Sequence, residues 1–240
     1  MKIFLSVLLI ISLNAFTQAQ SRKALQLRKD YIDVAQRKVV GTRMPLSKWE
    51  VIDTIRYRIQ GKLQYLNSKT LGMFLQQVHE LTGLTFVESK DKSKYQMLFF
   101  FGTLPEYSIY TKIEIPLNLV EKSCTWQSFL TGQNNRLVQT SFCIDPSKVK
   151  TQLEGRFYFQ SLFLKSIGIC GNIDDPMSIF FNCYSNKNSG LTMIDKRLIK
   201  IHYHPKIKSG MLDYLVERTV RDSIDLESLV NAKFPIRGDL

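Results

Sequence analysis

The chain has 240 residues and a formal net charge of +12, and 44% of its residues are hydrophobic while 22% are charged. This composition is that of a folded globular protein rather than a disordered chain, and the length is sufficient for one substantial core. The basic residues are scattered and accompany no recognition motif, which argues against nucleic acid as a partner. The excess charge predicts contact with anionic surfaces, or serves only to keep the surface soluble.

The first 19 residues have the pattern of a cleavable secretory signal. Lys2 supplies the positive start, an apolar run covers residues 3–11, and Ala19 is a small residue suited to signal peptidase. The run is shorter than the ~20 residues that span a bilayer, although a retained anchor is the alternative interpretation. We therefore expect an exported protein, periplasmic or extracellular, with no transmembrane segment after signal removal. Its mature part, residues 20–240, would carry a charge of +11, because only Lys2 is lost from the +12 of the whole chain.

The first half of the mature chain alternates predicted helices and strands. Residues 21–39 place apolar side chains at helical spacing among many charges, and residues 54–60 alternate as a half-buried strand does. A helix is expected from a cap at Asn67 or Ser68 to a stop at Gly83. Strands are expected at residues 84–87 and 95–101, the second of them buried because it is apolar throughout.

The second half continues this order. Strands are expected at residues 112–117 and 136–144, and Asp145-Pro146-Ser147 then opens a long helix that Gly168 ends. Two further helical stretches, residues 192–201 and 213–231, follow a loop-rich section. Strands mixed with helices in this order predict an α+β fold with mixed α/β layers.

Four cysteines remain after the signal, and an even number in an exported chain favours disulfides. Three pairings are possible. Cys124–Cys143 and Cys170–Cys183 are preferred because each joins neighbours across a short connection, while free buried thiols are the alternative.

Several short motifs lie at the end of the long helix, in the loop after it, and in the tail. They are Ile167-Gly168-Ile169, then Asn172 with Asp175-Pro176-Met177-Ser178-Ile179-Phe180, then Leu191-Thr192 with Asp195, and finally Tyr203-His204-Pro205 with Ser209-Gly210-Met211. Together they resemble a family of exported bacterial proteins of unknown function that are related to zinc metallopeptidases. The resemblance implies a zincin-like single domain over residues 20–240. Residues 20–168 would form a mixed sheet backed by two helices, and residues 169–240 a loop-rich, helical C-terminal subdomain.

In that family the second helix normally carries the metal site, which needs two ligands one helical turn apart and a glutamate beside the first. The register of the resemblance places the ligands at Ser161 and Lys165, the glutamate at Leu162 and a third ligand at Gly171. None of these residues can do that work. A hydroxyl is a poor ligand, an ammonium repels a cation, and leucine and glycine offer no donor. We therefore expect no cofactor and a degenerate site that binds rather than cleaves.

Other residues offer a displaced site. His202 and His204 would share a face if they lay on a strand, and Asp174 and Asp175 could add carboxylates, although the same aspartates suit a turn before proline. His79 is interpreted as a structural histidine, and Ser209-Gly210-Met211 as a tight turn with a buried methionine.

Three functions follow from these observations. The first is an exported, non-catalytic binding or structural protein of the cell envelope, whose partner is an unknown protein or an anionic envelope component. The second is a metal-dependent hydrolase with a displaced site, and the third a basic protein that binds anionic glycan or lipid.

Overall fold

A five-stranded sheet with the strand order β4-β3-β5-β7-β6 organises the molecule. The computed structural model describes residues 22–39, 41–50, 54–91, 93–185, 187 and 190–234. Strands β4, β3, β5 and β7 are parallel to one another, and β6 runs antiparallel to β7 at one edge. The strand bounds are Thr54–Gly61 for β3, Thr85–Glu88 for β4, Met97–Phe101 for β5, Thr125–Thr131 for β6 and Leu137–Ile144 for β7.

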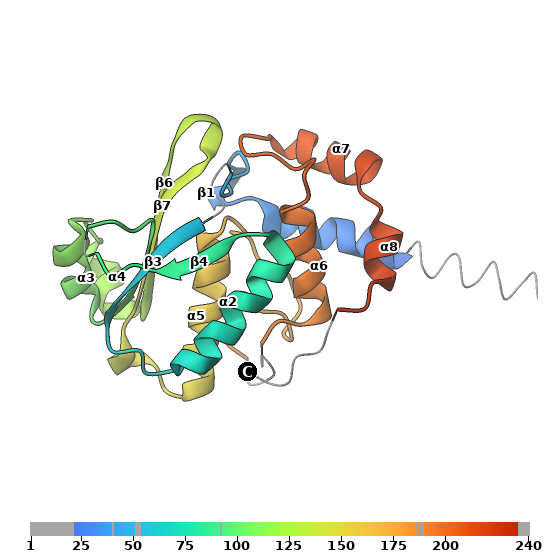
Figure 1. Cartoon of the computed structure of the whole chain (residues 1–240). Helices are drawn as coiled ribbons and strands as arrows, with labels where there is room; N and C mark the ends of the chain where they lie inside the picture. The colour runs from blue at the N-terminus through green and yellow to red at the C-terminus, as the bar shows by residue number, and fades with distance from the viewer. Residues whose placement is uncertain are drawn as a thin grey trace, which may run out of the picture.

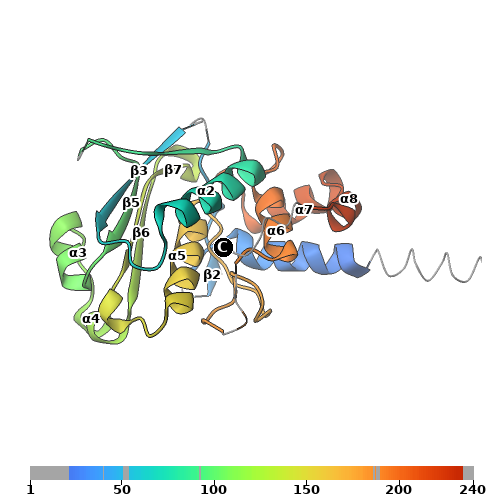
Figure 2. The ribbon, with the colours of Figure 1, turned by 60° about the horizontal axis from the view of Figure 1, so that its bottom comes forward.

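Helices cover both faces of this sheet (Figures 1 and 2). Helices α2 (Ser68–Thr82) and α5 (Gln152–Ser166) lie on one face, and the shorter α3 (Leu104–Thr111) and α4 (Leu117–Lys122) lie on the other. Beyond α2 and α5 lie the C-terminal helices and a helix over residues 22–35, which we call the N-terminal helix. The C-terminal helices are α6 (Met193–His202), α7 (Asp213–Ser223) and α8 (Leu226–Asn231).

An aromatic cluster fills the space between the sheet and α5. Phe99 of β5 is fully buried and stacks on Tyr57 and Phe142 of the neighbouring strands, with ring centroids 5.0 Å apart in each pair. Phe159 of α5 meets Phe99 edge to face at 5.4 Å, and Phe163 does so at 5.8 Å. The main apolar cluster runs from Leu27 to Ile224, so the sheet and the C-terminal helices share one core.

The predicted helix-and-strand pattern is confirmed at several elements. Strand β3 buries Ile55 and Tyr57 on one side, as the alternation indicated. Helix α2 is capped by Asn67, which accepts a hydrogen bond from the backbone of Thr70, and ends at Gly83 with a positive φ of 79°. The mixed α/β fold class is therefore the observed one.

Other expectations are wrong. Residues 112–117 are not a strand: α3 ends before them and α4 begins at Leu117, while the edge strand β6 was not foreseen. The helix expected from Asp145 is a short 3-10 turn, Pro146–Lys148, followed by α5. The stretch 213–231 is two helices. The helix expected over residues 21–39 stops at residue 35. The end of the predicted range instead forms the short strand β1 (Lys38–Val39), which pairs with β2 (Thr42–Arg43).

The expected signal segment, residues 1–19, lies outside the described residues. Within the described ranges, no helix combines the length and the apolar character needed to cross a bilayer.

Candidate functional site

The four positions that the resemblance assigns to a metal site lie on and just after α5, and they do not present donor groups to a common centre. Ser161 is buried, and Leu162 is part of the main apolar core. Lys165 and Gly171 instead line an open pocket of about 430 Å³ beside α5. We call this the α5 pocket; Arg37, Lys38, Gln127 and Phe129 also line it.

The N-terminal helix closes the third-ligand position. The backbone N–H of Gly171 donates to the carbonyl oxygen of Val34 at 2.9 Å. A Cβ added at Gly171 would lie 1.9 Å from the carbonyl oxygen of Asp33, far inside van der Waals contact. No side chain can therefore stand at this position while the N-terminal helix keeps its place.

The turn that ends α5 is also built around close contacts. Gly168 has a φ of 108°, and a Cβ there would lie 2.0 Å from the carbonyl oxygen of Ser47. Trp49 Nε1 donates to the carbonyl oxygen of Ser166 at 3.0 Å. The hydroxyl of Tyr203 donates to the carbonyl oxygen of Ile167 at 2.7 Å. These bonds satisfy carbonyl groups at the C-terminus of α5 and fix the wall of the α5 pocket.

Burial shifts the pKa values of two groups that line the α5 pocket. Desolvation lowers the pKa of Lys165, because burial penalises the charged ammonium. Desolvation also raises the pKa of the adjacent Cys170 thiol to about 11, so this cysteine stays protonated at neutral pH and is a poor nucleophile.

His202 does not lie on a strand with His204; it is the last residue of α6 and is fully buried. Its Nδ1 lies 3.4 Å from the hydroxyl of Tyr31 in the N-terminal helix, and its carbonyl oxygen accepts from Lys48 Nζ at 3.4 Å. The ring also interacts with the backbone of Ser47, which partly offsets the effect of burial on its pKa. Burial, with a smaller effect of the Lys48 charge, lowers the pKa of His202 to about 3, so the ring is neutral.

Lys48 shares this buried cluster, and desolvation lowers its pKa to about 8. In the sequence Tyr31 is one of the apolar positions at helical spacing in residues 21–39, and Lys48 is not a candidate for any site. A buried lysine in a polar segment has no pattern that would distinguish it. Through these contacts the cluster joins α6, the N-terminal helix and residues 46–50.

The other residues considered as metal ligands make local contacts of their own and do not join His202. His204 accepts from the backbone of Lys206 through Nδ1 at 3.2 Å, and Asp175 accepts from the backbone of Met177 at 2.9 Å, both local turn interactions. His79 Nδ1 lies 3.0 Å from the carbonyl oxygen of Leu84. Among the residues that the structure describes, no group of three histidine, cysteine or acidic side chains could hold a metal ion.

The motifs in the tail make hydrogen bonds that stabilise the fold. Asp195 is buried and bonds the hydroxyl of Ser178, the backbone N–H of Ile179 at 3.3 Å and that of Thr192 at 2.7 Å, so it caps α6 and holds the preceding loop. Burial raises the pKa of Asp195 to about 6. The turn at Gly210 pairs with Leu46 through backbone bonds of 2.8 and 2.9 Å, and the Met211 side chain packs partly buried against the core.

All four cysteines are free in the structure. Cys143 packs with the α3 side of the sheet, where its thiol donates to the carbonyl oxygen of Gly102 at 3.3 Å. Cys124 instead interacts with Tyr158 of α5, on the opposite face. The preferred pairing Cys124–Cys143 is therefore not formed in this arrangement. The thiol of Cys170 donates to the carbonyl oxygen of Lys165 at 3.6 Å, and Cys183 is exposed, so this second pair is not bridged either.

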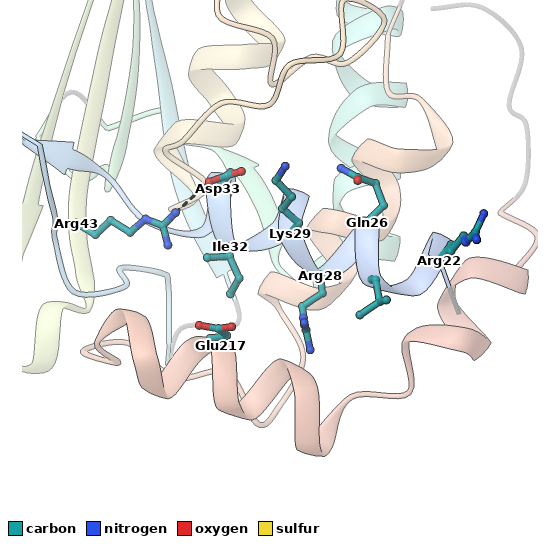
Figure 3. Close-up of a pocket in the computed structure, with 9 residues that line it drawn as sticks. Arg22, Gln26, Arg28, Lys29, Ile32, Asp33, Arg43 and Glu217 are labelled. Atoms are coloured by element: carbon teal, nitrogen blue, oxygen red, sulfur yellow. Dashed lines mark hydrogen bonds and ion pairs between the residues drawn. The ribbon is translucent and has the colours of Figure 1, made fainter. Parts of the chain in front are cut away.

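A second pocket, of about 710 Å³, lies between the N-terminal helix and α7. Figure 3 shows Arg28 and Ile32 of the N-terminal helix and Glu217 of α7 pointing into the space between the two helices. Arg43 at its end is neutralised, since its guanidinium pairs with Asp33 at 3.0 Å and with Asp213 at 2.6 Å.

Comparison with protein-family models and with curated proteins gives no match for this chain.

Proposed function

We propose that the protein is an exported, non-catalytic binding protein of the bacterial cell envelope, built on a zincin-like scaffold whose metal site has degenerated. The arrangement of elements supports this proposal. A mixed sheet is backed on one face by two helices, α2 and α5, and α5 directly follows the last strand of the sheet through a short 3-10 turn.

The observation that carries the proposal is the closure of the third-ligand position at Gly171. A metallopeptidase needs three protein ligands and an open coordination position for water. Here the first two positions hold a hydroxyl and an ammonium, and the third has no space for any side chain because the carbonyl oxygen of Asp33 would lie 1.9 Å from its Cβ. A pocket that remains open beside such a site can still bind a ligand.

Two measurements on the mature protein test the absence of catalysis. Protein purified after growth in zinc-supplemented medium should contain much less than one zinc per chain by elemental mass spectrometry. Digestion of casein and of a mixed peptide library should not exceed that of buffer, with or without chelator. Stoichiometric zinc together with chelator-sensitive cleavage would refute the proposal.

Export is tested separately. A fusion of residues 1–40 to alkaline phosphatase, which is active only outside the cytoplasm, should give active enzyme in a bacterial host. Changing Leu8 and Leu9 to arginine interrupts the apolar run and should abolish that activity. A fusion that stays inactive with the native residues would contradict export.

A second candidate function, binding to an anionic lipid or glycan, is favoured by the charge of the N-terminal helix. Arg22, Arg28 and Lys29 line the pocket between this helix and α7, where Glu217 is the acidic residue not already paired with Arg43. Such binding rests on charge attraction, which salt screens over about 10 Å at 0.1 M.

Sedimentation with vesicles that contain 30% phosphatidylserine tests this candidate. Binding should fall steeply between 50 and 300 mM salt, and changing Arg22, Arg28 and Lys29 together to glutamine should remove most of it. Changing the exposed Lys62, Lys69 and Lys122 to glutamine is the matched control, because it removes the same charge from other parts of the surface. An equal loss in both variants would show a dependence on net charge alone.

A further inference from the structure

The α5 pocket collects positive charge that the protein itself does not neutralise. Arg37, Lys38 and Lys165 all line it, and within the described residues none of the three forms an ion pair with a carboxylate. The pocket also contains Asp33, but this carboxylate is already paired with Arg43 at 3.0 Å.

Among the three cations of the α5 pocket, Lys165 is the one whose charge burial destabilises, so a bound anion would stabilise it most. It projects from the last turn of α5, and its ammonium is largely removed from water, which lowers its pKa. A partly desolvated charge without a partner is unfavourable, and a bound anion offsets this cost. The ionisable group that acts on the pKa of Lys165 is the Cys170 thiol, whose own pKa of about 11 keeps it neutral at pH 7.

The remaining wall adds a hydrogen-bond acceptor and an apolar surface. Gln127 on the edge strand β6 uses its amide nitrogen to donate to the carbonyl oxygen of Leu162 at 3.0 Å and to the hydroxyl of Ser166 at 2.9 Å. These bonds fix the orientation of the amide, so its oxygen remains as an acceptor. Phe129, two residues further along β6, lies under the guanidinium of Arg37 at 5.8 Å from the ring centroid.

We infer that the α5 pocket binds a small carboxylate ligand of amino-acid or peptide type. Its carboxylate would face Lys165 and Arg37, an N–H of the ligand would donate to Gln127, and an apolar part would lie on Phe129. A cavity of about 430 Å³ accommodates a ligand of two or three amino-acid residues. The inference rests on the proposed function, since a ligand held at this position without a metal is bound and not cleaved.

The affinity of short peptides, measured by isothermal titration calorimetry, tests this inference. The probes are acetyl-Ala-Ala with a free carboxylate, the same peptide with a C-terminal amide, and inorganic phosphate. The free carboxylate should bind at least tenfold more tightly than the amide, and phosphate more weakly than the carboxylate. Lys165→Met should weaken binding of the carboxylate peptide at least tenfold, while Lys69→Met, an exposed lysine on α2, should leave it unchanged.

Arg37→Gln gives a second variant that does not depend on the stability of α5, because Arg37 is exposed. It should weaken the carboxylate peptide more than the amide peptide. Equal binding of the two peptides, binding of neither, or tighter binding of phosphate would overturn the inference. Mass spectrometry of the recovered peptide separates the two proposals: a cleaved probe contradicts the non-catalytic function, whereas an intact probe that prefers the carboxylate form supports both.

Discussion

Replacing Gly171 by alanine should destabilise the protein, because the added methyl group collides with the N-terminal helix. The new Cβ would lie 1.9 Å from the carbonyl oxygen of Asp33 and 2.7 Å from the Cα of Val34, so backbone and not a flexible side chain has to move. Overpacking of this kind costs about 1–3 kcal/mol, and the lost hydrogen bond from Gly171 to Val34 adds about 1 kcal/mol. The expected decrease in the free energy of unfolding is therefore about 2–4 kcal/mol.

Urea denaturation followed by tryptophan fluorescence measures this change, since Trp49 is buried against the end of α5. Gly72→Ala is the matched control. Gly72 lies in the exposed part of α2 with no atom within 4 Å of its Cβ position, so alanine there should stabilise the protein by about 0.5–1 kcal/mol. If Gly171→Ala were as stable as the native protein, the N-terminal helix would not close the position of Gly171, and the proposed loss of a third metal ligand by steric closure would be refuted.

Three further predictions follow from buried groups. The pKa of His202 is about 3 in the folded protein and 6.5 ordinarily, so the unfolded chain takes up a proton first as the pH falls below 6.5. This group alone lowers the free energy of unfolding by up to about 1.4 kcal/mol per pH unit, while Asp195, whose pKa burial raises to about 6, binds a proton in the folded state over the same range and acts in the opposite direction. Urea denaturation at pH 7 and pH 5 should therefore show that the native protein loses stability relative to His202→Leu as the pH falls, and an equal change in the two proteins would contradict a buried neutral His202. Phe159→Ala should cost about 3–5 kcal/mol by the same assay, because the fully buried ring contacts Phe99 and its neighbours; a loss below 1 kcal/mol would contradict the aromatic core. Alkylation of the native protein should label the exposed Cys183 first and reach the buried Cys143 only in denaturant, and early labelling of Cys143 would argue against its position under α3.

The elements that were predictable from the sequence carry their own start and stop signals. Helix α2 combines a cap, an apolar stripe and a terminal glycine within 17 residues, from Asn67 to Gly83, so no distant information was required. Helix α3 had a comparable signal that was overlooked: Thr103 and Glu106 form a capping box, with proline in the first turn. The alternation of Ile113 and Ile115 was mistaken for a strand because both side chains pack under α3 from a loop.

Edge strand β6 was missed for a different reason. Its residues, such as Gln127 and Phe129, are all partly or wholly exposed, so neither face shows the apolar alternation of a half-buried strand. The expected ligand positions Ser161 and Lys165 follow from the resemblance, by counting back from Gly168. The closure at Gly171 could not be predicted, because the backbone that causes it belongs to residues 33 and 34, more than a hundred positions earlier in the chain.

The contacts of the N-terminal helix also constrain the order in which this chain can fold. Tyr31 meets a histidine 171 residues further along, so the interaction requires nearly the whole polypeptide to have been synthesised. Contacts of such long sequence separation form late and slow folding, because a large loop must close first. A chain truncated before residue 171 would keep the residues of all five strands of the sheet but would lack the histidine that Tyr31 contacts and the glycine that bonds Val34. The N-terminal helix, although made first, can therefore take its place only after the C-terminal part has been made.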